Sequence, residues 1–256
     1  MKAPVFLLLC CLTFCGCSGQ QPSKPTPQSE AHYQWVELVR EGPFRKSYNY
    51  EMVAIGDSVL LLHPQGFWVS ANGKDWTAID LPNIVGNLAF LEYVYFNGAL
   101  YGLGTFSGNI EQYQITTQIA RSKNLRSWEI VAEKSNLPER FFYHPVVFQG
   151  KIWIVGGQDG RQSFSDVWSS ADGVNWQQVV TKAPFGARDS DRLVVFQERL
   201  WLLGTDAWSS ADGLVWQQET PQIATTDLFG YNAVVYHNQL WLLGCNRAGR
   251  FRAEVL

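Results

Sequence analysis

The chain has 256 residues, of which 46% are hydrophobic and 14% aromatic, enough apolar side chain to bury a core. Charged residues make up only 17% of the sequence, and the formal net charge is −3. This balance argues against the broad basic surface that nucleic-acid binding requires.

The first residues predict a targeting segment that is separate from the fold. Lys2 supplies a minimal positive start, and the apolar run from Ala3 to Phe14 is too short to span a bilayer comfortably. The run ends in Phe14-Cys15-Gly16-Cys17, which resembles a bacterial lipobox with Cys17 as the lipidated residue. An ordinary signal peptide cut nearby is the alternative. Because Ser18 and not Asp follows Cys17, the resemblance implies sorting to the outer membrane in a Gram-negative bacterium.

We therefore expect a lipoprotein signal peptide at 1–16, a flexible tether at 17–31 and a folded part at 32–256. The tether is rich in Gln, Ser, Pro and Lys, a composition that cannot bury a core. The targeting segment holds Cys10, Cys11, Cys15 and Cys17, so Cys245 is the single cysteine of the folded part. A disulfide framework is therefore not expected, and Cys245 is predicted to be a small buried side chain.

A first repeat recurs five times in the folded part. Each copy has two hydrophobic residues, a two-residue turn, one variable residue and a second apolar run. Short β-branched and aromatic runs around such turns predict β-hairpins. The five copies are Ala54–Leu60, Tyr95–Tyr101, Val147–Trp153, Val195–Trp201 and Val235–Trp241.

A second repeat, Ser-x-(Asp/Asn)-Gly-x-x-Trp, follows the first one four times. Asp or Asn can bond to its own turn, Gly can take a positive φ, and the Trp can fill space between neighbouring sheets, so the unit predicts a second hairpin. Three copies also have a Trp eight residues before the last one, at 68, 168 and 208. The copies are Ser70–Trp76, Ser170–Trp176, Ser210–Trp216 and the degenerate Ser122–Trp128.

The numbers of the two repeats differ by one, which predicts how the chain closes. The stretch 251–256 reads as a third strand without a fourth, and 35–39 reads as a fourth strand without a third. Joining them predicts an all-β fold: a five-bladed β-propeller of four-stranded antiparallel blades, closed by an N-terminal outer strand in the C-terminal blade. Gly42-Pro43-Phe44-Arg45 supports this arrangement, because it resembles the stretch that ends at Phe185.

These units resemble bacterial kelch-like repeats of the galactose-oxidase central-domain type, over about residues 33 to 256. Gly156-Gly157 looks like the kelch double glycine, and the second repeat also resembles the Asp box of sialidases. The resemblance implies a propeller in which these motifs build blades and do not catalyse. Neither the copper ligands of galactose oxidase nor the arginine triad of sialidases can be placed in this sequence.

A polar position at the start of each inner strand predicts the candidate site. Alignment places Glu51, Glu92, His144, Arg192 and Asn232 in this column, two residues before an invariant valine. The column indicates either wet strand starts or a ligand-binding ring at the channel mouth. Predicted neighbours are Arg45, Tyr50, Tyr143, Arg188, Asp189, Asp191 and Tyr231. Two long loops, Thr105–Thr117 and Gln158–Asp166, are expected to wall one side.

No catalytic signature accompanies this column. The four histidines have no metal-ligand spacing, and no nucleophile elbow or phosphate-binding loop occurs. We therefore expect a monomeric module without cofactor, metal or nucleic acid, which binds a glycan or a protein ligand. The first alternative is a glycosidase-type enzyme that uses paired carboxylates of the column, and the second is an assembly factor that binds through blade edges.

Overall fold

The computed structural model describes residues 36–44, 50–63, 66–79, 92–109, 112–223, 231–247 and 250–255. For 105–109, 112–114, 244–247 and 250–255 it describes the backbone alone. The predicted signal peptide and tether, the lipidation residue Cys17, the closing Trp35 and Arg45 lie outside the described residues.

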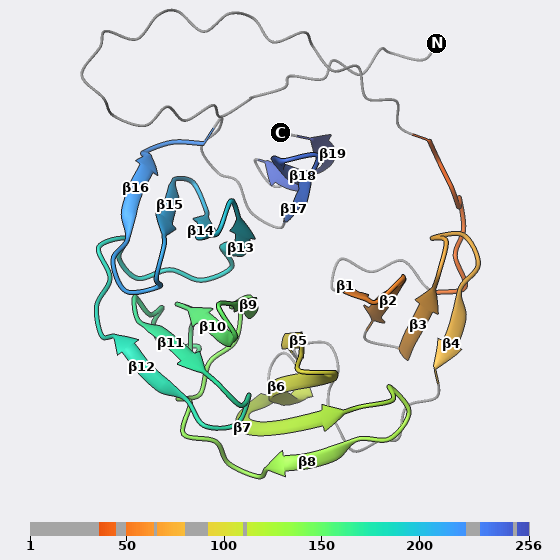
Figure 1. Cartoon of the computed structure of the whole chain (residues 1–256), viewed down its shortest axis with the longest axis horizontal. Helices are drawn as coiled ribbons and strands as arrows, with labels where there is room; N and C mark the ends of the chain where they lie inside the picture. The colour runs from red at the N-terminus through yellow and green to blue at the C-terminus, as the bar shows by residue number, and fades with distance from the viewer. Residues whose placement is uncertain are drawn as a thin grey trace, which may run out of the picture.

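Five antiparallel sheets surround a central axis (Figure 1), and in each the strands follow chain order from the inside outward. The first contains β1 (Glu51–Ile55), β2 (Ser58–His63), β3 (Gly66–Ser70) and β4 (Thr77–Ile79). The second contains β5 (Glu92–Phe96), β6 (Ala99–Asn109), β7 (Gln112–Ser122) and β8 (Glu129–Ala132). The third contains β9 (Val146–Phe148), β10 (Lys151–Val155), β11 (Val167–Ser170) and β12 (Gln177–Val180). The fourth contains β13 (Arg192–Phe196), β14 (Arg199–Leu203), β15 (Ala207–Ser210) and β16 (Gln217–Thr220). The fifth contains β17 (Asn232–Tyr236), β18 (Gln239–Arg247) and β19 (Arg250–Val255).

This architecture confirms the prediction of an all-β propeller with four-stranded antiparallel blades. Four sheets have four strands, whereas the fifth has three in the described part of the chain. The C-terminal stretch pairs with β18 as the expected third strand. Residues 36–44 form no strand, so the predicted fourth strand of this sheet is not seen.

The second repeat forms the turn between the two outer strands, as its chemistry predicts. In the third sheet, Ser170 Oγ accepts a hydrogen bond from Gly173 N at 2.9 Å, and Asp172 Oδ1 accepts from Asn175 N at 2.7 Å. Gly173 has a φ of 78°, which a side chain disfavours. A Cβ there would also lie 2.6 Å from the ring of Tyr101 in the preceding sheet. The glycine is therefore required by both the turn and the contact between sheets.

The core consists of hydrophobic clusters between successive sheets. One cluster joins the first and second sheets, with Leu60 against Leu100, and three more follow at the next three boundaries. Four of the five inner-strand valines predicted to pack do so: Val94 is 6% exposed, and Val53, Val146 and Val194 are partly buried against the clusters, whereas Val234 is not. Each sheet is thus held mainly by its two neighbours.

The boundary between the fifth and first sheets differs from the other four. The corresponding valine of β17, Val234, is 40% exposed, and Tyr236 on the same side of the strand is 53% exposed. Across the boundary, Met52 of β1 is 54% exposed. The described residues therefore leave apolar side chains uncovered where the last sheet meets the first.

Candidate functional site

The polar column lies where the inner strands begin, at one end of the axis. Glu51, Glu92, Arg192 and Asn232 are the first residues of β1, β5, β13 and β17, and His144 lies two residues before β9. The inner strands pack side by side in the order β1, β5, β9, β13 and β17. We call these five residues the polar ring. Each is partly exposed.

Arg192 reaches from the fourth sheet toward groups of the other four. Its Nε donates a hydrogen bond to the carbonyl oxygen of Tyr231, just before the fifth sheet. Its Nη1 contacts the imidazole of His144 before the third sheet, 2.8 Å from Nδ1. Its charge also acts on Glu51 and Glu92 of the first and second sheets. One guanidinium therefore connects four of the five polar-ring residues.

The two carboxyl groups of the polar ring hold protons more tightly than isolated glutamates do. Burial raises the pKa of Glu51 to about 7, although the charge of Arg192 and a hydrogen bond from the Tyr93 backbone oppose the shift. Burial and the charge of Glu51 raise the pKa of Glu92 well above its ordinary value. Arg192 therefore does not neutralise both carboxylates, and near neutral pH the pair retains a proton.

The remaining groups of this end are neutral. Burial and the charge of Arg192 lower the pKa of His144 well below its ordinary value, so the imidazole is uncharged at pH 7. Its Nδ1 lies 3.9 Å from Glu92 Oε2. The hydroxyl of Tyr93, the residue after Glu92, is buried and has no hydrogen-bond partner among the described residues. Burial and both glutamates raise the pKa of this phenol.

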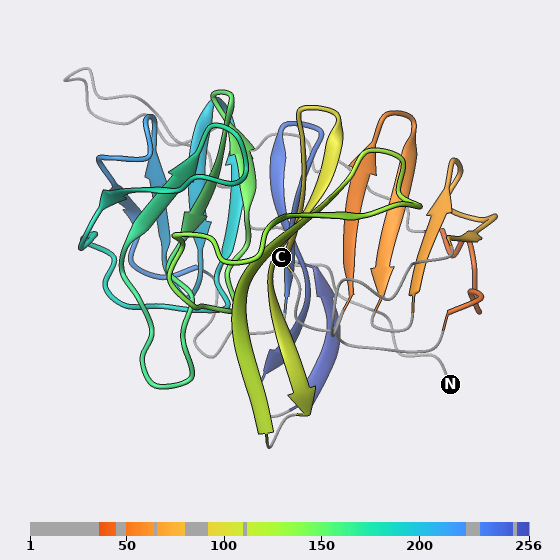
Figure 2. The same ribbon diagram turned by 90° about the horizontal axis from the view of Figure 1, so that it is seen from below.

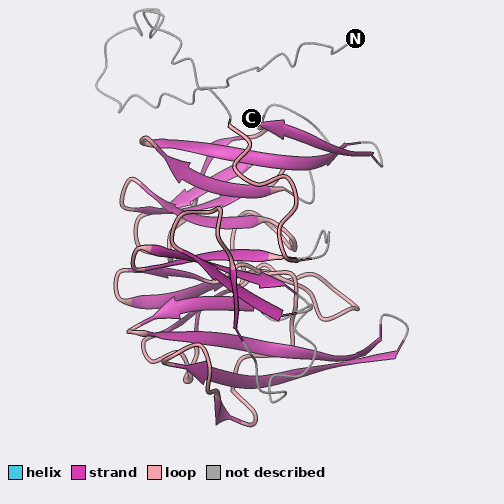
Figure 3. Cartoon of the chain, turned by 90° about the vertical axis from the view of Figure 1, so that its right-hand side faces the viewer, coloured by secondary structure: helices cyan, strands magenta, loops and turns pink. Residues whose placement is uncertain are grey.

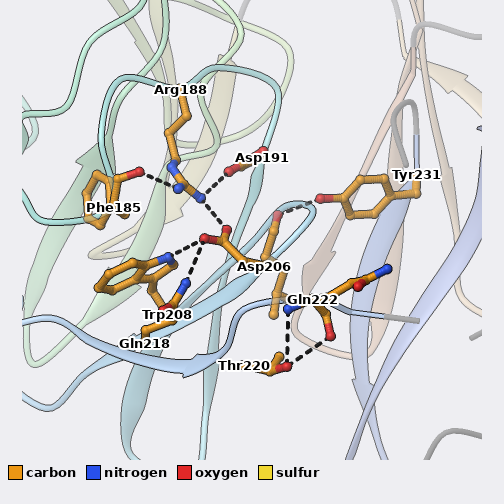
Figure 4. A network of polar contacts seen from close by, with 10 residues as sticks. Phe185, Arg188, Asp191, Asp206, Trp208, Gln218, Thr220, Gln222 and Tyr231 are labelled. Atoms are coloured by element: carbon orange, nitrogen blue, oxygen red, sulfur yellow. Dashed lines mark hydrogen bonds and ion pairs between the residues drawn. The ribbon is translucent and has the colours of Figure 1, made fainter. Parts of the chain in front are cut away.

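Three predicted neighbours, Arg188, Asp189 and Asp191, lie in a separate cluster between the third and fourth sheets. Figure 4 shows Arg188 and Asp191 of this cluster. Arg188 Nη1 donates to Asp191 Oδ2 at 2.9 Å and to Asp206 Oδ1 at 2.8 Å. Asp206 Oδ2 also accepts from Trp208 Nε1 at 2.7 Å. Asp189 accepts from the hydroxyl of Ser163. The structure thus places Arg188, Asp189 and Asp191 in contacts that join loops, not in the polar ring.

We call an arginine that bonds to a carboxylate of a neighbouring loop, as Arg188 does, an arginine clamp. A second clamp lies one sheet earlier, and sequence reasoning missed it. Arg140 donates to both carboxylate oxygens of Asp166, at 2.8 and 3.0 Å, and to the carbonyl of Gly156. Asp166 also accepts from Trp168 Nε1 at 2.7 Å. The available signal was an Asp two residues before Trp168 and Trp208, with an Arg four residues before the polar column. Both clamps support the loops that carry the polar ring.

The predicted tyrosines differ in their surroundings. Tyr143 and Tyr231 are buried. The hydroxyl of Tyr143 donates a hydrogen bond to the carbonyl of Leu103 in β6, and the hydroxyl of Tyr231 donates to the carbonyl of Leu203 at the end of β14. These two residues attach each loop to the preceding sheet. Tyr50 is 43% exposed, directly precedes Glu51, and is close enough to act on the charge of Arg192. It therefore belongs to the rim of the polar ring.

Two long hairpins project beyond the polar ring on the same face. The register pairs Glu92 with Leu103 and Asn232 with Leu243, yet β6 continues to Asn109 and β18 to Arg247. Figures 2 and 3 show β6–β7 and β18–β19 extending from this face, and Figure 1 places them on opposite sides of the axis. The ring entrance therefore lies between two projecting hairpins.

The structure differs from the prediction for both long loops. The first is mostly strand, and the second is a loop that is attached to its neighbours. Thr105–Thr117, expected as a loop, belongs mostly to β6 and β7, because its alternating Thr, Phe, Tyr and Ile residues continue the ladder. Gln158–Asp166 is a loop, but bridges connect it to Phe141 and Arg188. It is therefore attached to the neighbouring loops on both sides.

Within the described ranges, no group of three or more His, Cys, Asp or Glu side chains could hold a metal ion. No helix among the residues that the structure describes is long and apolar enough to cross a membrane.

The fold defines the chain as a β-propeller, whose charged strand starts form a candidate binding site. Residues 126–252 match the family model described as the DUF6242 beta propeller domain. The structure described as "Structure of YjhT" is similar, with a TM-score of 0.68 and 16% identity, over 82% of this chain and 75% of that one. At this identity the likeness shows the fold alone. No curated protein matches the chain.

Proposed function

We propose that the protein is a binding module of the cell envelope that holds a glycan or protein ligand at the polar ring. The observation that carries the proposal is the position of Arg192. This partly exposed cation acts on the carboxyl groups of both Glu51 and Glu92, and its single positive charge does not neutralise the pair. Charged groups with perturbed pKa values at a concave strand-end platform are typical of ligand sites. The two projecting hairpins extend from this same face (Figure 2).

Retention on an affinity matrix tests this proposal. The immobilised protein should retain a component of cell-wall glycan or periplasmic protein extracts, and Arg192→Met and Glu92→Gln should lose it. Asp189→Asn is the matched control, because Asp189 bonds to Ser163 and Ser190 outside the polar ring. Equal retention by the wild type and Arg192→Met would contradict the proposal. Retention that depends on outer-strand residues would instead indicate an assembly factor.

The proposed location rests on lipidation of Cys17, which would anchor the propeller through a tether at the membrane surface. The support is the lipobox-like sequence and the composition of residues 17–31. Expression with Cys17→Ser should move the protein from the membrane fraction to the soluble fraction. The same distribution for both proteins would contradict lipidation at this position.

We also propose that residues 35–39, of which 36–39 form no strand in this structure, complete the fifth sheet beside β19 and close five kelch-like blades of the galactose-oxidase type. The support is the place of Phe44, whose ring lies 5.7 and 5.6 Å from the rings of Trp68 and Trp76. Phe185, which follows β12 of the third sheet, has the two equivalent partners in the next sheet, Trp208 and Trp216. Cysteine crosslinking of Val36 to the β19 segment should succeed if this strand forms.

A second candidate function is glycoside hydrolysis, because Glu51 and Glu92 form a carboxyl pair with raised pKa values. Such a pair can provide a general acid and a base or nucleophile. Hydrolysis of aryl glycosides that disappears in Glu51→Gln and in Glu92→Gln would establish this function. Activity that survives both substitutions would remove it.

A further inference from the structure

We propose that the ligand of the polar ring is a glycan that carries a protonated amine, and that Glu51 and Glu92 hold the amine. This inference rests on the proposed binding function and adds the chemical class of the ligand. It follows from the charges, the unpaired hydroxyl and the exposed aromatic side chains at the entrance.

The charges of the polar ring are unbalanced. Two carboxyl groups share one guanidinium, and that guanidinium already bonds to the Tyr231 carbonyl and contacts His144. His144 is neutral and lies 3.9 Å from Glu92, so it supplies no second cation. In the free protein a proton compensates for the missing charge. A ligand ammonium group can take the place of this proton and can also donate hydrogen bonds to both carboxylates.

The hydroxyl of Tyr93 is a second observation that points to the same ligand. The ring of Tyr93 packs against Phe67 and Trp128 between the first and second sheets. The hydroxyl is buried without a hydrogen-bond partner among the described residues, and the charges of both glutamates act on it. Buried hydroxyls normally have a partner, since an unmade hydrogen bond is costly. A nearby carboxylate is a stronger acceptor when it is ionised than when it is protonated. A bound ammonium group, which keeps the carboxylates ionised, would therefore favour such a bond from Tyr93.

Exposed aromatic side chains at the rim favour a sugar over a flexible peptide side chain. Tyr50 directly precedes Glu51 and is 43% exposed. Phe142, two residues before His144, is 38% exposed and has a φ of 58°, which is rare for a bulky residue. Flat aromatic faces provide large rigid surfaces against which a pyranose ring can stack. Both side chains lie next to polar-ring residues in sequence.

Binding should release a proton and therefore depend on pH. Glu51 titrates near pH 7 in the free protein, so an ammonium ligand must displace a proton below that value. For a ligand whose amine stays protonated, affinity should be about 25-fold lower at pH 5.5 than at pH 7.5. The fall should be smaller for an amino sugar, because its amine loses its own proton near neutral pH. Glu51 and Glu92 act on one another. The other titratable or charged groups that interact with them are Arg192, Tyr93 and Tyr143. Burial and the charge of Arg192 lower the pKa of His144, the nearest further titratable group, well below its ordinary value.

Calorimetric titration of the full chain with three probes tests the inference. The probes are the fully deacetylated glucosamine tetramer, the N-acetylglucosamine tetramer and tetralysine, measured at pH 7.5 and 5.5. We expect the glucosamine tetramer to bind at least about tenfold more tightly than either other probe. Glu51→Gln should remove this preference, and Asp189→Asn should keep it. Thermal unfolding of each variant checks that the fold is retained.

Each other outcome has a defined meaning. Equal binding of the acetylated and free-amine tetramers would overturn the amine, and equal binding of tetralysine would overturn the glycan. If an extract component binds in an Arg192-dependent manner while all three probes fail, the inference is wrong but the binding function stands. If neither the extracts nor the probes bind at the polar ring, the proposed function itself fails.

Discussion

The two arginine clamps predict an unequal cost for the same substitution. Asp166→Ala would leave Arg140, whose side chain is 1% exposed, with backbone carbonyls as its only acceptors among the described residues. Asp206→Ala would leave Arg188 with Asp191 at 2.9 Å. Both changes also remove the acceptor of a tryptophan N–H, and this loss is common to the two variants.

The size of the difference follows from these partners. Removing one member of a buried ion pair costs about 3–5 kcal/mol, because the other charge stays buried and uncompensated. We therefore expect Asp166→Ala to lower the free energy of unfolding by about 3–5 kcal/mol. Asp206→Ala should cost about 1–3 kcal/mol, since its arginine retains an ionised partner.

Urea unfolding followed by tryptophan fluorescence and circular dichroism measures both values. Arg140→Met combined with Asp166→Ala should recover part of the loss, because the double variant buries no unpaired charge. An Asp206→Ala variant that is as unstable as Asp166→Ala, or less stable, would refute the reasoning from retained partners.

Three further predictions test packing and protonation. Gly213→Ala should lower the free energy of unfolding by about 2 kcal/mol more than Gly98→Ala, because a Cβ at 213 would lie 2.1 Å from an indole ring whereas the space at 98 is open. The two glycines have nearly equal φ angles, so equal unfolding midpoints would argue against the contact. Glu51→Gln should stabilise the protein increasingly as the pH rises from about 5 to 7. The protonated Glu51 stabilises the fold at low pH because its pKa is raised to about 7, and this contribution is lost as the pH rises to 7. A pH-independent difference in melting temperature between variant and wild type would contradict this prediction. Val94→Ala should lower the free energy of unfolding by about 2 kcal/mol and Val234→Ala by less than about 1 kcal/mol, because these valines are 6% and 40% exposed. Equal losses on denaturant unfolding would show that the boundary between the fifth and first sheets is packed.

The sequence was sufficient to predict the blades because their signals are local. Turn chemistry within seven residues fixed the outer hairpins, as the bonds of Ser170 and Asp172 confirm. Alignment of the inner strands likewise predicted the starts of β1, β5, β13 and β17 and the packing of four of the five aligned valines, Val234 being the exception. The polar column was therefore placed correctly along the strands, before any contact across the axis was known.

Contacts between distant residues were not predictable in the same way. The reach of Arg192 across the axis depends on the length of its side chain and on channel width, neither of which a repeat reveals. Arg140 and Asp166 are 26 residues apart, and their pairing depends on how two loops cross. The extension of β6 and β7 was missed because polar residues at a hairpin tip resemble a loop when read in sequence.

The uncovered boundary between the first and fifth sheets has a consequence for local stability. Among the described residues, four boundaries are packed and the last one exposes apolar side chains, so we expect the five sheets to behave energetically as a linear array bent into a circle. In such arrays the terminal units have one stabilising neighbour where internal units have two. Amide hydrogen exchange should consequently be fastest in β1 to β4 and β17 to β19, and slowest in the third sheet.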